Sequence, residues 1–149
     1  MNIVINIEQY NDNNVIFCEP IKNNVMLDGY FIRIIYSTDI FALNGIYLQL
    51  PLNDIACEKY YLKYKCIFNV AKHKNMIDKI KIIEENLLQK YKIADKTPQF
   101  KIYEQLQNGN IKLFGNIENQ TNPLFILKIS GIWETQLNYG LTYKFVAEK

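Results

Sequence analysis

The strongest constraint on the fold is an alternation of apolar and polar side chains that runs through most of the sequence. β-branched and aromatic residues recur at every second position, and turn-forming residues such as Asn and Gly separate the segments. This period is typical of strands with one buried face, because successive side chains point to opposite sides. The pattern covers residues 3–9, 15–19, 29–37, 46–50, 60–70, 99–105, 110–115, 124–132 and 140–146. It predicts a β-rich fold, with a hairpin turn at Asn44-Gly45.

One segment departs from this pattern and has the period of an α-helix. Seven of its apolar residues recur mostly three or four positions apart, and Asn75 with Asp78 resembles a capping box. We therefore expect one amphipathic helix at about 75–91 and no other helix. A chain of 149 residues is the size of one hydrophobic core. We predict a single β-rich α+β domain over 1–149.

Composition limits the classes of function and the location. Seventeen basic and 15 acidic side chains leave a net charge of +2, too little for the whole molecule to attract a polyanion. Any nucleic-acid site is therefore expected to be a local patch. We expect no leader and no membrane span, because no apolar run is long enough. Cys18, Cys57 and Cys66 lack C-x-x-C spacing, which favours free thiols in a reducing compartment, the host cytoplasm or nucleus.

The sequence contains no recognisable catalytic constellation. The single histidine, His73, lies between Lys72 and Lys74, and we interpret it as a surface residue. Ser37 and Ser130 are the only serines and neither lies in a G-x-S-x-G motif. Zinc-ligand spacings and phosphate-binding glycine loops are also missing from the sequence. We predict a protein that is not an enzyme and that uses no metal and no cofactor.

A distributed pattern of lysines and aromatic residues is the main functional signal. These residues occupy the polar positions of the predicted strands. Cationic side chains there can bind phosphates, and exposed rings can stack on unpaired bases. An equally ordinary interpretation is that the lysines only solvate one face of a sheet. The members are Arg33, Tyr61, Lys63, Lys65, Lys101, Tyr103, Lys112, Phe114, Lys128 and Lys144.

Trp133 is the single tryptophan and stands where a predicted strand meets a turn. One interpretation is structural, with the indole closing one end of the core. The other is functional, with the indole serving as a platform on which a base stacks.

The last two predicted strands resemble the closing hairpin of phage-type single-stranded-DNA-binding proteins, a family with relatives in nucleocytoplasmic large DNA viruses. The resemblance lies in Phe125-Ile126-Leu127-Lys128-Ile129-Ser130-Gly131-Ile132-Trp133 and Asn138-Tyr139-Gly140-Leu141-Thr142-Tyr143-Lys144-Phe145. The segments Tyr30–Ser37 and Leu43–Leu48 add to it more loosely. Together they cover about a third of the chain.

This resemblance implies an OB-fold, a bent five-stranded barrel with one capping helix. More than five strands are predicted, so an elaborated barrel and a two-sheet sandwich both stay open. By resemblance, the residues expected to contact the bound strand are Lys128, Trp133, Tyr143 and Lys144.

The leading hypothesis is a non-catalytic, sequence-tolerant single-stranded-DNA-binding protein of a DNA virus. Its expected partner is single-stranded DNA, with other viral proteins or a second copy of the chain as further candidates. We expect neither a membrane nor a small-molecule substrate as a partner.

The alternative is a structural or capsid-associated β-domain that acts through protein contacts. Tyr and Trp are favoured anchors in such interfaces. The near-neutral charge and the final residues Ala147-Glu148-Lys149, which depart from the acidic tail of the phage family, favour this alternative.

Overall fold

A computed structural model describes residues 3–23, 29–114 and 123–148, and it is mostly β-structure. Neither helix in this part of the chain is long and apolar enough to cross a membrane. The helices are α1 (Lys74–Lys90) and α2 (Lys101–Gln107). The strands are β1 (Ile5–Asn6), β2 (Val15–Phe17), β3 (Ile21–Asn23), β4 (Gly29–Ser37), β5 (Ala42–Leu43), β6 (Ile46–Leu50), β7 (Ala56–Tyr60), β8 (Lys63–Ile67), β9 (Thr97–Gln99), β10 (Asn110–Phe114), β11 (Leu124–Glu134) and β12 (Asn138–Glu148).

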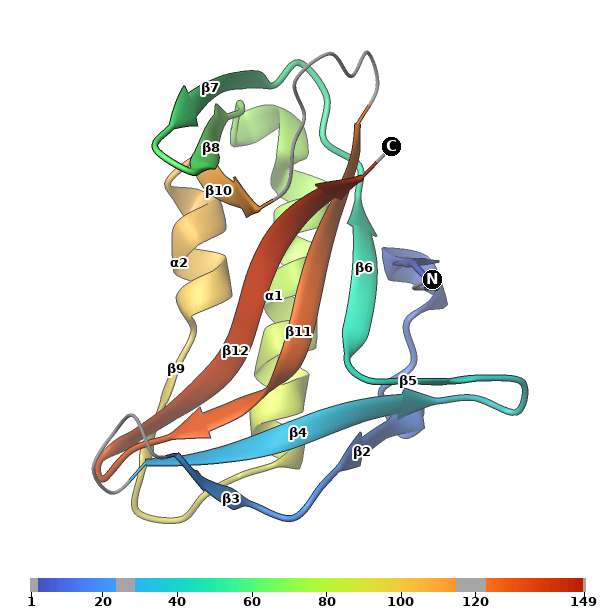
Figure 1. Cartoon of the computed structure of the whole chain (residues 1–149), viewed down its shortest axis with the longest axis vertical. Coiled ribbons are helices and arrows are strands. Elements are labelled where there is room, and N and C mark those ends of the chain that lie inside the picture. The colour runs from blue at the N-terminus through green and yellow to red at the C-terminus, as the bar shows by residue number, and fades with distance from the viewer. Residues whose placement is uncertain (1–2, 24–28, 115–122, 149) are drawn as a thin grey trace.

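The strands form one mixed, open sheet, whose main path runs β1-β6-β11-β12-β10-β8-β7. Three ladders are parallel, β1–β6, β10–β12 and β9–β12, and the others are antiparallel. β11 is central, because its first half pairs with β6 and its second half pairs with β4, while β12 follows it throughout. Figure 1 shows β4 crossing one end of β11 and β12, and β7, β8 and β10 gathered at the opposite end.

A bulge at Ser130 allows β11 to change partner. The register with β12 shifts between Ile129 and Gly131 at this point. Gly131 is required there because a Cβ atom would lie 2.3 Å from the carbonyl oxygen of Ile32 and 2.6 Å from the Phe31 ring. The extra residue bends the strand and brings β4 against its second half.

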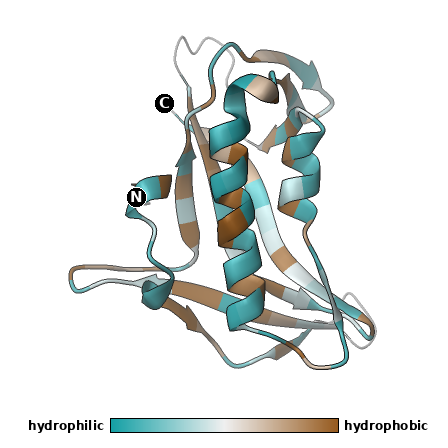
Figure 2. Ribbon diagram, turned by 180° about the vertical axis from the view of Figure 1, so that it is seen from behind, coloured by the Kyte–Doolittle hydropathy of each residue, from teal (hydrophilic) through white to brown (hydrophobic). Residues whose placement is uncertain are grey.

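α1 covers one face of the sheet, as Figures 1 and 2 show from opposite sides. The sequence prediction of this helix is confirmed to within one residue at each end. Its apolar side chains recur every third or fourth position and pack on inward residues of β4, β6, β11 and β12 in one core. We call the face of the sheet that points away from α1 the outer face. The buried side chains of α1 are Met76, Ile77, Ile80, Ile83, Glu84, Leu87 and Leu88.

The start of α1 differs from the expected capping box. His73 is the N-cap and no side chain caps the helix there. Asp78 instead pairs with Lys74 at 2.9 Å, one turn earlier. His73 is also not on the surface. It is 5 % exposed, its Nε2 atom accepts a hydrogen bond from the Asn53 amide, and its Nδ1 atom donates to the carbonyl oxygen of Asn69. These two contacts hold the ring in a structural position.

The second helix, α2, occupies part of a predicted strand, so the expectation of a single helix is wrong. Ile102 and Leu106 are both fully buried and lie one helical turn apart. The carboxylate of Glu84 accepts hydrogen bonds from the amides of Ile102 and Tyr103, at 3.0 and 2.9 Å. These amides lie in the first turn of α2, where backbone N–H groups have no partner within the helix itself. A cap that comes from another helix leaves no local sequence signal.

The predicted strand over 60–70 is interrupted by the turn of a hairpin, so β8 is the strand that lies wholly within it. β7 and β8 are antiparallel, Tyr60 pairs with Lys63, and Tyr61-Leu62 forms the turn. Sequence reasoning missed it because the turn contains no Gly, Asn or Pro. Cys57 and Cys66 are directly opposite each other, with Cα atoms 4.1 Å apart, and form a disulfide. The expectation of free thiols therefore holds only for Cys18, which is the free cysteine of the described residues.

Asn44-Gly45 is a corner and does not close the predicted hairpin. Residues before it pair with β4, whereas β6 after it pairs with β1 and β11. Gly45 does adopt the positive φ of +113° that the turn residues suggested. The two flanking segments separate because β6 buries its side chains against the centre of the sheet.

Candidate nucleic-acid interface

The outer face of the sheet collects most of the lysines that the sequence analysis selected. The direction of each follows from alternation, because its neighbours along the strand belong to the core under α1. Cys66 faces the core beside Lys65, and Leu127 does so beside Lys128. The lysines themselves therefore point outward, away from both helices.

Four of these lysines lie side by side, one on each of four neighbouring strands. They are Lys65 of β8, Lys112 of β10, Lys144 of β12 and Lys128 of β11, and we call them the lysine row. Lys65 is directly opposite Lys112, and Lys128 is directly opposite Lys144. The residues that follow Lys112 and Lys144 are partners in the β10–β12 ladder, so the row is continuous.

Two pairs of like charge face each other directly within the lysine row. Like charges directly opposite each other on two strands destabilise a sheet, by up to about 1 kcal/mol per pair. Within the described part of the chain, Lys65, Lys112 and Lys128 take part in no ion pair. The nearest balancing charge in the ladder is Glu58 of β7, opposite Lys65. A bound anion would further relieve the repulsion between Lys65 and Lys112.

An aromatic ring lies beneath the end of the row. Tyr47 of β6 is directly opposite Lys128, and the Lys128 ammonium lies 5.4 Å from the centre of its ring. Tyr47 is 8 % exposed but does not belong to the core cluster under α1. The ring thus supports the lysine from below and is shielded by it.

A second group of rings lies further along β11, roughly 17 Å from Lys128 at the rise of an antiparallel strand. Phe31 lies over Gly131, and Trp133 lies over Gly140, whose Cβ position is only 2.7 Å from the indole. Phe31 and Trp133 are partners in the β4–β11 ladder. Both are half-buried on the outer face, so we call them the ring pair. Trp133 lies outside the core cluster, so the interpretation that its indole closes one end of the core is wrong.

Arg33 connects the ring pair to the rest of the outer face. Its guanidinium carbon lies 5.9 Å from the centre of the Phe31 ring, and its Nη1 atom donates to Oδ1 of Asn44 at 2.8 Å. The side chain is exposed, as its position opposite Gly131 suggests. Positive charge therefore lies beside the ring pair as well as along the lysine row.

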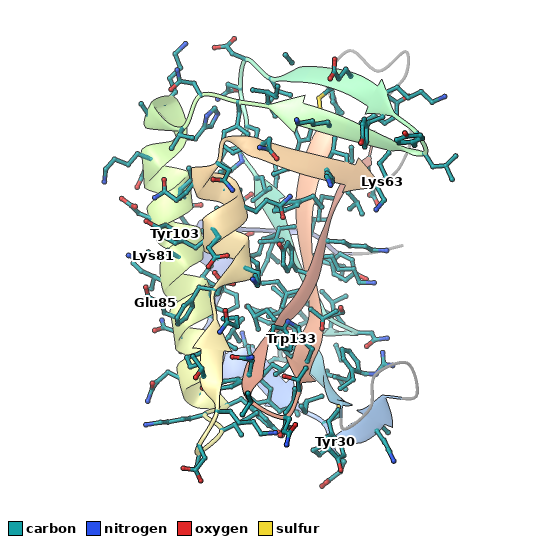
Figure 3. All side chains as sticks on the ribbon, turned by 90° about the vertical axis from the view of Figure 1, so that its left-hand side faces the viewer. Tyr30, Lys63, Lys81, Glu85, Tyr103 and Trp133 are labelled. Carbon is teal, nitrogen blue, oxygen red and sulfur yellow. A yellow bond between two sulfur atoms is a disulfide. The ribbon has the colours of Figure 1, made fainter. Side chains whose placement is uncertain are left out.

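Three of the selected residues lie on the other side of the sheet. Lys101 and Tyr103 belong to α2, where Tyr103 lies under the Lys81 ammonium at 4.8 Å. Tyr143 faces α2 from β12, and its hydroxyl donates to Oε1 of Gln105 at 2.7 Å. Burial raises the pKa of Tyr143 to about 12. Figure 3 shows Lys81 and Tyr103 on the helical side and Lys63 on the far side of the sheet.

Two further selected residues differ from expectation in other ways. Tyr61 lies in the β7–β8 turn and does not share a strand face with Lys63. Phe114 is at the end of β10, but its side chain lies outside the described part of the structure. The structure instead adds Phe31 and Tyr47, which sequence reasoning missed. Phe31 stands two positions before Arg33 on β4, a spacing that could have revealed it.

Glu84 is the buried carboxyl group whose pKa is most clearly perturbed among the described residues. Burial raises its pKa to about 7, although the hydrogen bonds from Tyr103 and Ile102 act to lower it. Such a shift can mark a catalytic acid. Here both carboxylate oxygens accept backbone amides of α2. The group therefore serves to hold α2 against α1.

Comparisons of the chain with protein-family models, with curated proteins and with solved structures found no match.

Proposed function

We propose that this protein binds single-stranded nucleic acid, and single-stranded DNA in particular, through its outer face. In this proposal it acts without catalysis and with little sequence preference. The observation that carries the proposal is the lysine row, in which like charges face each other across two ladders. Such an arrangement favours a ligand with regularly spaced negative charge.

The rings supply the second contact that a single strand needs. Unpaired bases stack on aromatic side chains with about 1–3 kcal/mol per base and with little dependence on sequence. Phe31 and Trp133 each pack against a glycine, and both remain half-exposed on the outer face. In the proposed complex, phosphates follow the lysine row and Arg33, while bases reach the ring pair.

We also propose a relationship to the OB-fold proteins of DNA viruses that the sequence resembles. Its support is β11, which bends at Ser130 and passes from β6 to β4 as a barrel strand does. One long helix also lies across the core. The described strands form an open sheet, so on this proposal the barrel has been opened and elaborated.

The proposal is tested by fluorescence anisotropy of labelled oligo-dT and of duplex DNA across a salt series. We expect tighter binding to the single strand, with an affinity that falls steeply as salt rises. Trp133 emission should be quenched in the same titration as bases stack on it. Absence of binding at low salt would refute the proposal and favour a structural domain that acts through protein contacts.

A further inference from the structure

The end of the β7–β8 hairpin exposes three apolar or aromatic side chains in succession. Tyr60 is 53 % exposed, Tyr61 is 81 % exposed and Leu62 is 95 % exposed. We call these residues the tyrosine tip. Single exposed apolar residues are normal, but a cluster at the apex of a projecting hairpin is not explained by folding.

The backbone of the tip is unfavourable for the residues it carries. Tyr61 has a φ of 56°, in the left-handed region that Gly or Asn adopts more easily. The Cys57–Cys66 disulfide joins the two strands just behind the turn and holds the hairpin in place. The hairpin thus carries large side chains at turn positions where small polar residues would be more stable.

Positive charge surrounds the tip. Lys59 and Lys63, both exposed, are the residues that flank it on β7 and β8, and the next pair of residues along the hairpin, Glu58 and Lys65, carries opposite charges. A second highly exposed apolar residue, Ile40, lacks this setting, because its neighbour is Asp39. Apolar exposure and positive charge coincide at the tyrosine tip.

We propose that the tyrosine tip inserts into the surface of an anionic lipid bilayer. Leu62 would enter the hydrocarbon, the two tyrosines would lie at the interface with their hydroxyls hydrated, and Lys59 and Lys63 would meet the lipid phosphates. Tyrosine is enriched at this depth of a membrane, and basic residues close to an anionic surface strengthen binding. This function is separate from nucleic-acid binding and does not depend on it.

Other partners fit the tip less well. A stable protein interface buries about 800 Å² on each partner, which one short turn cannot supply. Nucleic-acid bases would stack on the tyrosines but would gain nothing from an apolar leucine at the apex. The expectation of no membrane partner rested on the lack of a spanning segment, which does not bear on a surface contact.

The test is flotation with phosphatidylcholine vesicles that contain roughly one-third phosphatidylserine, compared with vesicles of phosphatidylcholine alone. We expect the protein to float with the anionic vesicles and to float less with the neutral ones. Leu62→Ser and Tyr61→Asn should each lower the partition coefficient about tenfold. Asn keeps the left-handed turn, so the hairpin is retained. The matched control, Ile40→Ser, removes an equally exposed apolar side chain and should bind as the parent protein does.

A second measurement locates the contact. Leu62→Trp in a Trp133→Phe background places the only tryptophan at the tip, and brominated lipids should quench its emission. Failure of the protein to float would overturn the proposal, and so would equal flotation of the parent and Leu62→Ser. Quenching of this tryptophan by oligo-dT, with no quenching by brominated lipid, would assign the tip to nucleic acid and also overturn it.

Discussion

Lys65 of β8 and Lys112 of β10 are direct partners across an antiparallel ladder, with both ammonium groups on the outer face. Sheets ordinarily avoid like charges at paired positions, because the repulsion is not screened by an intervening residue. The same relationship recurs between Lys128 and Lys144. The proposed function makes these two pairs part of a surface that binds an anion.

Lys112→Glu should therefore raise stability and lower nucleic-acid affinity. The new carboxylate would lie opposite Lys65, and we expect the free energy of unfolding to rise by about 0.5 kcal/mol. Urea denaturation measures the first effect, and oligo-dT anisotropy at the same ionic strength measures the second. A variant that loses both stability and affinity would show that Lys112 has a structural role instead.

The raised pKa of Glu84 leads us to expect that the stability of the protein depends on pH. Its pKa in the folded protein is about 7, raised mainly by burial from an ordinary value of 4.5. The folded state therefore holds a proton that the unfolded state releases between these values. The free energy of unfolding should fall as pH rises from about 4.5 to about 7, by roughly 3 kcal/mol in total, and should change little from this source above that.

Glu84→Gln is the matched variant for that prediction. The amide oxygen can still accept a hydrogen bond from α2, but the group no longer titrates. Urea unfolding of both proteins at several pH values should show a smaller fall for the variant. If the two curves stay parallel over this range, Glu84 is not the group responsible.

Gly131 is predicted to tolerate no side chain. A Cβ atom there would overlap the carbonyl oxygen of Ile32 and the Phe31 ring. Gly131→Ala should lower the free energy of unfolding by about 2 kcal/mol or more, because β11 and β4 must separate. Ser130→Ala at the same bulge loses only a long hydrogen bond to Thr142 and should lose less than about 1 kcal/mol. Similar losses for the two variants would contradict the close packing at Gly131.

The Cys57–Cys66 disulfide leads to two expectations, one for the number of reactive thiols and one for the free energy of unfolding. Denatured protein without reductant should contain one reactive thiol, that of Cys18, and all three should react after reduction. Cys57→Ser should lower the free energy of unfolding by about 2–3 kcal/mol, as expected for a short closed loop. Three reactive thiols before reduction would show that the bond does not form.

Strong local periodicity was sufficient to predict several elements. β4 and β6 have the predicted bounds, and α1 differs by one residue at each end. The failures are places where the deciding interaction is distant or the local chemistry is unusual. α2 depends on Glu84, which is 18 residues from Ile102, and the β7–β8 turn consists of Tyr and Leu. Neither leaves a pattern that a window of sequence can detect.

Local periodicity also accounts for which residues of the candidate site could be predicted. Alternation assigns a face to each residue of a strand, so Lys65, Lys112 and Lys128 were selected for the face on which they lie. Lys101 and Tyr103 were misplaced because their segment is helical. Pairing between strands is not visible in one sequence, so the continuity of the lysine row and the closeness of Phe31 to Trp133 could not be predicted.

The most direct test of the central claim compares two changes of equal charge on opposite sides of the sheet. Lys128→Glu alters the lysine row, whereas Lys101→Glu alters an exposed lysine at the start of α2. Oligo-dT anisotropy across a salt series should show that Lys128→Glu weakens binding and reduces the magnitude of the salt slope by about 0.7. Lys101→Glu should bind as the parent protein does. Equal loss in both variants would show a response to net charge alone and would contradict a binding surface on the outer face.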